Sequence, residues 1–141
     1  MGSKNKLKRF RENATFDNVF QPKRDELVEL TYPLKGHWHS KIFKNNNPLV
    51  LELGCGKGEY SVALAKQFPS KNFIGIDIKG ARIWTGAKES IEQKLKNVCF
   101  IRFFKTILLS FSNIHKYRQT GLCFINAATT NMHIYGMRKR M

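Results

Sequence analysis

The chain between residues 49 and 102 alternates short apolar runs with segments of helical period. The runs are LVLEL (49–53), FIGID (73–77) and VCFIR (98–102), and the intervening helical segments are 59–68 and 80–97. Each run is bounded by turn-forming residues, a pattern typical of buried parallel strands. The alternation therefore predicts a right-handed β-α-β-α-β unit, the N-terminal half of a Rossmann-like α/β fold.

The periodicity also predicts which side chains of the two helices face the sheet. The expected inner faces are Tyr60, Ala63, Leu64 and Phe68 in the first helix, and Ile83, Ala87, Ile91 and Leu95 in the second. Gly86 interrupts the second helix and is expected to weaken it mildly, because glycine has a low helix propensity.

The turn between the first strand and the first helix carries Gly54, Gly56 and Gly58 in a G-x-G-x-G pattern. Such glycines let the backbone turn tightly and approach a ligand, and the following helix offers free N–H groups. A dinucleotide site needs its third glycine at position 59, where Glu59 would repel a pyrophosphate, and no G-K-[ST] phosphate loop is present. The loop therefore predicts a ligand that has an adenosine ribose and no phosphate.

Two acids accompany the loop. Asp77 ends the second strand 19 residues after Gly58, where a β-α-β unit places an acceptor for ribose hydroxyls. Glu52 lies within the first strand, where a carboxylate is costly unless an amino group or a sulfonium cation pairs with it. Alternatively, Asp77 is a polar strand end and Glu52 a structural acid bonded to backbone N–H groups of the loop. Together the acids and the glycines favour S-adenosylmethionine as the cofactor.

The charge balance points to an anionic partner. The chain has 25 Lys and Arg residues against 10 Asp and Glu residues, a net charge of +15, which favours nucleic acid over a merely basic surface. Five basic residues precede the first acid, Glu12, and predict a mobile arm that contacts phosphates: Lys4, Lys6, Lys8, Arg9 and Arg11.

Other classes of protein fit less well. The three cysteines have no C-x-x-C spacing and predict no disulfide framework, which suits a reducing cytoplasm. No apolar run is long enough to span a membrane. The His37 and His39 pair lacks further ligands at metal-site spacing, so no metal is predicted. Cys55 is expected to be a small filler of the loop and not a nucleophile, because no histidine is placed to activate it.

Three segments carry a resemblance to a known family: KNKLKRFRENATFDNVFQ (4–21), VLELGCGKGEYSVALA (50–65) and FIGIDIKGARIWTGAKES (73–90). They resemble the bacterial tRNA (guanine-N7-)-methyltransferases, especially the Bacteroidetes type, from about residue 4 to Arg102. The resemblance implies methyl transfer from S-adenosylmethionine to N7 of a guanine in the tRNA variable loop. It assigns Glu52, Asp77 and the three loop glycines to cofactor binding.

The resemblance ends at Phe103. The family's next polar cofactor contact corresponds to Phe104, and its F-P-D-P-like segment is absent, so no catalytic residue is predicted. Residues 103–141 contain six basic residues and no acid. The expected organisation is a basic extension (1–48), a partial cofactor domain (49–102) and a non-family tail (103–141).

We interpret the tail as the product of a frameshift, and therefore expect an impaired enzyme; a gene fusion and a diverged C-terminal half are the alternatives. The competing function is a non-catalytic, basic nucleic-acid-binding protein derived from the same family. Without a fourth strand, strand 49–53 is expected to become an exposed apolar edge, which the apolar segment 98–111 would cover or make worse.

Overall fold

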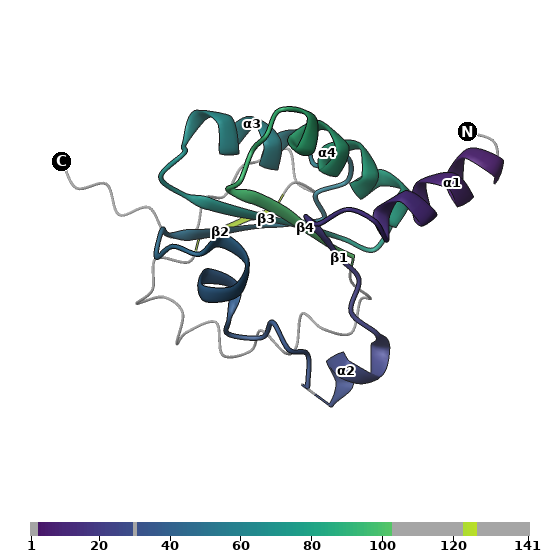
Figure 1. Cartoon of the computed structure of the whole chain (residues 1–141), viewed down its shortest axis with the longest axis horizontal. Helices are drawn as coiled ribbons and strands as arrows, with labels where there is room; N and C mark the ends of the chain where they lie inside the picture. Colours follow the sequence, from purple (N-terminus) through teal and green to yellow (C-terminus); the bar gives the residue numbers. More distant parts are fainter. Residues whose placement is uncertain (1–2, 30, 103–122, 127–141) are drawn as a thin grey trace.

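The computed structural model describes residues 3–29, 31–102 and 123–126 (Figure 1). Its helices are α1 (Ser3–Asn13), α2 (Arg24–Val28), α3 (Glu59–Gln67), α4 (Gly80–Glu92) and a π-helix, η1 (Trp38–Phe43). Its strands are β1 (Val19–Phe20), β2 (Leu49–Leu53), β3 (Asn72–Asp77), β4 (Val98–Arg102) and β5 (Cys123–Asn126). None of these helices is long and apolar enough to cross a membrane.

The five strands form one sheet in the order β1-β4-β3-β2-β5, and every neighbouring pair is parallel. Leu49 of β2 is opposite Asn72 of β3, and Phe73 of β3 is opposite Val98 of β4. The chain order β2-α3-β3-α4-β4 confirms the predicted partial Rossmann-like α/β fold.

The sheet is covered on both faces. In Figure 1, α3 and α4 lie over one face, and η1 and α2 lie on the other side. Under α3 and α4 the core includes Val62, Ile83 and Phe100, and Phe100 is completely buried. On the opposite face, Phe43 of η1 packs with the apolar side chains that β2, β3 and β4 direct to that side.

The predicted inner face of α3 is partly wrong. Ser61, Val62 and Ala65 are the buried residues of this helix, whereas Tyr60 and Ala63 are exposed. The helix begins directly after Gly58, whose backbone is left-handed, so the glycine loop sets its rotation. Apolar and small residues occur on more than one side of this helix, so the hydrophobic period alone does not determine which side faces the sheet.

Helix α4 is shorter than predicted and differs in its packing. It ends at Glu92; Lys94 has a positive φ of 56°, and Leu95 N–H donates to the Ser90 carbonyl at 2.9 Å. Ile91, predicted to face the sheet, is 44% exposed. Gly86 is not simply a weak point, because a side chain there would collide with the Lys57 carbonyl. Glycine at this position lets α4 approach the loop closely.

The N-terminal residues do not form a mobile arm. They form helix α1, which packs against α4: Asn13 Nδ2 donates to the Gly80 carbonyl at 2.7 Å, and Trp84 Nε1 donates to Glu12 at 2.6 Å. Beyond α1, strand β1 pairs with β4 at the edge of the sheet. The basic pattern suggested a solvated arm, but contacts of Asn13 and Trp84 hold the helix against α4.

The expected exposure of strand 49–53 is also wrong. Strand β5 pairs with β2 along its length, with Val50 opposite Cys123 and Leu53 opposite Asn126. The backbone polar groups of β2 therefore have a strand on each side. Phe103 and Phe104, and most of the proposed tail, lie outside the described residues.

Candidate cofactor site

The glycine loop connects the end of β2 to the start of α3. Gly54, Gly56 and Gly58 have positive φ angles of 71°, 58° and 72°, a conformation that other residues adopt only with strain. The loop is fixed to the neighbouring strand, because the N–H groups of Gly54 and Cys55 both donate to the Ile76 carbonyl, at 2.8 and 3.0 Å. The sequence GCGKG thus folds into a tight turn beside the end of β3.

The three glycines of the loop have different surroundings. A Cβ atom added at Gly54 or Gly56 would meet nothing within 4 Å, so their backbone faces open space. A Cβ atom at Gly58 would overlap the ring of Phe100. The first two glycines leave room for a ligand. At position 58, packing against Phe100 is enough to require a glycine, so a contact between Gly58 and a cofactor stays a prediction.

Asp77 lies at the end of β3 and holds the loop. Its Oδ2 accepts a hydrogen bond from Gly56 N–H at 2.9 Å, and its Oδ1 accepts one from Lys79 N–H at 2.7 Å. Each carboxylate oxygen has a second lone pair, so the group can still accept hydrogen bonds from a ligand. The structure therefore brings Asp77 and the glycine loop together, as the spacing of the sequence predicted.

Glu52 is buried, with only 3% of its surface exposed. Its Oε2 accepts a hydrogen bond from the Ser61 hydroxyl, while its Oε1 has no hydrogen-bond partner among the described residues. Burial raises the pKa of this carboxyl group; hydrogen bonds from Ser61 lower it, and the nearby charge of Asp77 raises it further. A buried oxygen without a partner is costly, and a cationic hydrogen-bond donor would satisfy it.

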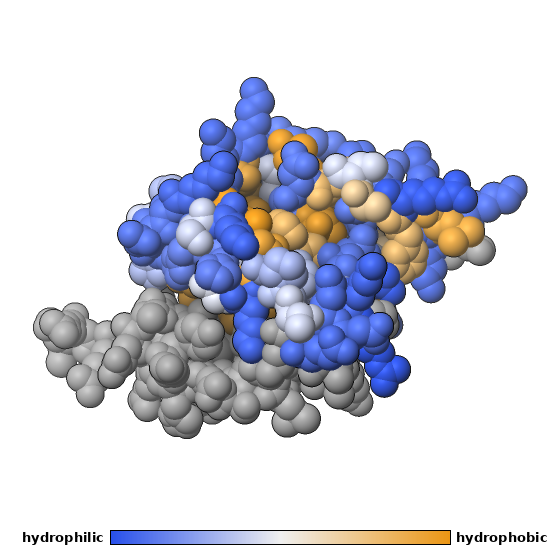
Figure 2. Space-filling model, turned by 60° about the horizontal axis from the view of Figure 1, so that its bottom comes forward, coloured by the Kyte–Doolittle hydropathy of each residue, from blue (hydrophilic) through white to orange (hydrophobic). Residues whose placement is uncertain are grey.

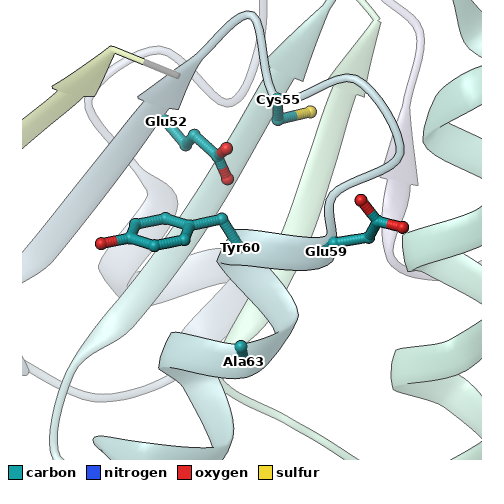
Figure 3. A pocket seen from close by; sticks show the side chains of 5 residues that line it. All are labelled: Glu52, Cys55, Glu59, Tyr60 and Ala63. Atoms are coloured by element: carbon teal, nitrogen blue, oxygen red, sulfur yellow. The ribbon is translucent and has the colours of Figure 1, made fainter. Parts of the chain in front are cut away.

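Glu52 lines a pocket of about 380 Å³ beside the first turn of α3. The residues that line the pocket are Glu52, Cys55, Glu59, Tyr60 and Ala63 (Figure 3). The hydrophobic period predicted Tyr60 and Ala63 in the core, whereas the structure places both in the pocket wall. Burial raises the pKa of the Cys55 thiol, which keeps it protonated at neutral pH and agrees with its expected role as a filler.

The basic residues predicted to bind phosphates divide into two groups. Four of them are exposed on α1: Lys4, Lys6, Lys8 and Arg11. Arg9 is half-buried; its guanidinium lies 4.4 Å from the centre of the Trp84 ring and donates to the Ala81 carbonyl at 3.4 Å. Within the described ranges, no group of three or more His, Cys, Asp or Glu side chains could hold a metal ion.

Comparison with known proteins identifies the class and then the family. A family model described as "Putative methyltransferase" matches residues 46–123, and so continues past Arg102. Curated tRNA (guanine-N(7)-)-methyltransferases of Christiangramia forsetii and Bacteroides fragilis are 64% and 52% identical to the chain, over 72% and 70% of its length. The chain belongs to the tRNA (guanine-N7-)-methyltransferase family.

The chain is much shorter than these relatives. It spans 46% of the Christiangramia forsetii protein and 39% of the Bacteroides fragilis protein. A solved structure of PKMT2 from Rickettsia typhi in complex with AdoHcy is 26% identical, with a TM-score of 0.38, over 60% of this chain and 16% of that one. An antibiotic-related methyltransferase is 16% identical, with a TM-score of 0.43, over 62% and 61%. At TM-scores this low, neither structure bears on the site.

Proposed function

We propose that this chain binds S-adenosylmethionine at the β2–α3 loop and is the cofactor-binding part of a cytoplasmic tRNA (guanine-N7-)-methyltransferase. The main support is Glu52, a buried residue that lines a pocket beside the glycine loop and whose Oε1 has no hydrogen-bond partner among the described residues. Membership of the methyltransferase family supports it.

The proposed roles follow from the geometry. Gly54 and Gly56 leave open space in which a ligand approaches the backbone. Asp77, fixed by its bonds to Gly56 and Lys79, accepts hydrogen bonds from ribose hydroxyls. Glu52 faces the positively charged end of the cofactor, which compensates the cost of its burial. When bound, S-adenosylmethionine supplies the electrophilic methyl group.

The proposed methyl acceptor requires little from the protein. N7 of guanine has a free lone pair, so no proton must be removed before it attacks the methyl group. The task of the enzyme is to expose the base and align N7 with the methyl group. The family's next polar cofactor contact corresponds to Phe104, and the sequence has no F-P-D-P-like segment, so we propose that catalysis by this chain is impaired.

The proposed tRNA contact lies on α1. Lys4, Lys6, Lys8 and Arg11 are exposed on this helix, and the net charge of +15 attracts a polyanion. We assign Arg9 to the attachment of α1 and not to phosphate binding, because its guanidinium is stacked on Trp84. The same surface supports the competing function, a nucleic-acid-binding protein without turnover.

One experiment separates the two functions. The full chain is incubated with bulk tRNA and S-adenosylmethionine that carries a labelled methyl group, and tRNA binding is measured in parallel at several salt concentrations. Label in guanine N7, even at a low rate, supports the methyltransferase. Salt-sensitive tRNA binding without any incorporation supports the binding protein.

We further propose that the change of composition at Phe103 marks an altered reading frame. The family match that continues to residue 123 is the observation against this. Sequencing the DNA across codons 95 to 110 and translating every frame tests the proposal. An F-P-D-P-like segment in another frame supports it, and its absence from all frames contradicts it.

A further inference from the structure

The pocket beside α3 differs in charge from the rest of the protein. The chain carries a net charge of +15, yet the pocket walls contain two carboxylates, Glu52 and Glu59, and none of the described residues that line it is basic. Two acids, with no basic side chain among the described residues of the pocket wall, favour a negative potential inside the pocket. Such a pocket favours a ligand group that carries positive charge.

Of the two acids in the pocket wall, Glu52 is the buried one and Glu59 is exposed. Glu52 lines the pocket and is only 3% exposed, and its Oε1 has no hydrogen-bond partner among the described residues. The Cys55 thiol beside it adds no charge, because burial raises its pKa. Any group that enters therefore meets one buried carboxyl group in surroundings that screen charge weakly, and a cationic group would favour its ionised form.

An aromatic ring forms another wall of the same pocket. Tyr60 is in the first turn of α3, is 37% exposed, and in Figure 3 its ring lies beside the Glu52 carboxylate. The face of an aromatic ring attracts cations through its quadrupole. Ala63, one turn further along α3, is small and leaves space above the helix.

We propose that Tyr60 determines specificity by placing its ring against the sulfonium of S-adenosylmethionine, with Glu52 as the buried counter-charge. This inference rests on the proposed cofactor. It assigns to Tyr60 the discrimination between the charged cofactor and its neutral-sulfur product, S-adenosylhomocysteine. It also explains why the exposed side of α3 carries an aromatic residue beside a glycine loop.

The test compares two ligands that differ in the sulfonium methyl and its charge. Calorimetry measures the affinities of the full chain for S-adenosylmethionine and S-adenosylhomocysteine, in the wild type and in the variants Tyr60→Leu, Tyr60→Gln and Tyr60→Phe. Gln67→Ala, an exposed change on the same helix away from the pocket, is the matched control. Thermal unfolding confirms that each variant is folded.

We expect Tyr60→Leu and Tyr60→Gln to reduce the preference for S-adenosylmethionine over S-adenosylhomocysteine by about 3- to 10-fold, with Tyr60→Phe and Gln67→Ala unchanged. Equal weakening of both ligands, or no change in their ratio, would overturn the role of Tyr60 while the cofactor site stands. If the wild-type chain bound neither ligand, the proposed function would fail, and the inference with it.

Discussion

The ring of Phe100 fills the space that a side chain at Gly58 would need. Phe100 is fully buried on β4, and side chains added at Gly75 of β3 or Gly86 of α4 would also come within 3 Å of its ring. One aromatic side chain thus fixes the distance between the glycine loop, the central strands and α4. The loop that we assign to the cofactor is therefore positioned by the hydrophobic core.

The contact between Gly58 and Phe100 predicts that one methyl group added at position 58 will strongly lower the stability of the fold. Gly58→Ala is expected to lower the free energy of unfolding by about 2–4 kcal/mol, since it adds left-handed backbone strain to an overlap with Phe100. Gly36→Ala is the control, because Gly36 has a similar φ of 75° and open space around it. Its expected cost is about 1 kcal/mol. Equal losses in urea unfolding would show that the Phe100 contact does not matter.

Asp77 is predicted both to hold the glycine loop in place and to contribute to the affinity for the ligand. Asp77→Asn removes the charge and one of the two acceptor oxygens that Gly56 and Lys79 use. We expect S-adenosylmethionine to bind about 10- to 100-fold more weakly, because charge-assisted hydrogen bonds are lost. Calorimetry with Asp17→Asn, a change at an exposed acid outside the site, provides the comparison. Similar affinities of the two variants would remove Asp77 from the site.

Two adjacent basic residues should behave differently. Lys8 is exposed on α1, whereas Arg9 is stacked on Trp84. Lys8→Ala is expected to weaken tRNA binding and to reduce the slope of log affinity against log salt by about 1, with stability nearly unchanged. Arg9→Ala is expected to lower the stability by about 1 kcal/mol and to alter Trp84 fluorescence.

Salt titrations of tRNA binding and urea unfolding of both variants check this division. An Arg9→Ala protein of unchanged stability that lost one unit of salt slope would assign Arg9 to phosphate binding instead.

The burial of Glu52 predicts a pH dependence of stability. Its pKa is raised in the folded state, so the folded protein holds this proton more tightly than the unfolded chain. The contribution of Glu52 is therefore fully present below the unfolded pKa, near 4.5, and is lost as pH rises through the folded pKa. Glu52→Gln should gain stability relative to the wild type over this pH range. Urea unfolding at a series of pH values measures the difference, and a constant difference would contradict the raised pKa.

The central strands were predicted well because the signals that mark them, apolar runs bounded by turn residues, lie within or next to each strand. The apolar run 49–53 ends at glycines and is β2 residue for residue, and the strand 98–102 is equally well marked. The spacing of Glu52, the glycines and Asp77 predicted a shared site, because carboxyl ends of parallel strands meet at one edge of a sheet.

Other features depend on contacts that are distant in sequence. Trp84 and Glu12, 72 residues apart, attach α1 to α4, and no pattern within either segment signals that bond. The positions of Tyr60 and Ala63 in the pocket wall were not predicted, because the loop geometry, and not the hydrophobic period, sets the rotation of α3.

The cofactor site is tested most directly by a calorimetric titration of the full chain with S-adenosylmethionine, repeated with Glu52→Gln and with Glu92→Gln, a change at an exposed acid on α4. We expect one binding site per chain, about 10-fold or more weaker binding in Glu52→Gln, and wild-type affinity in Glu92→Gln. A folded wild-type chain that binds no S-adenosylmethionine, or a Glu52→Gln variant that binds as well as the wild type, would contradict this expectation.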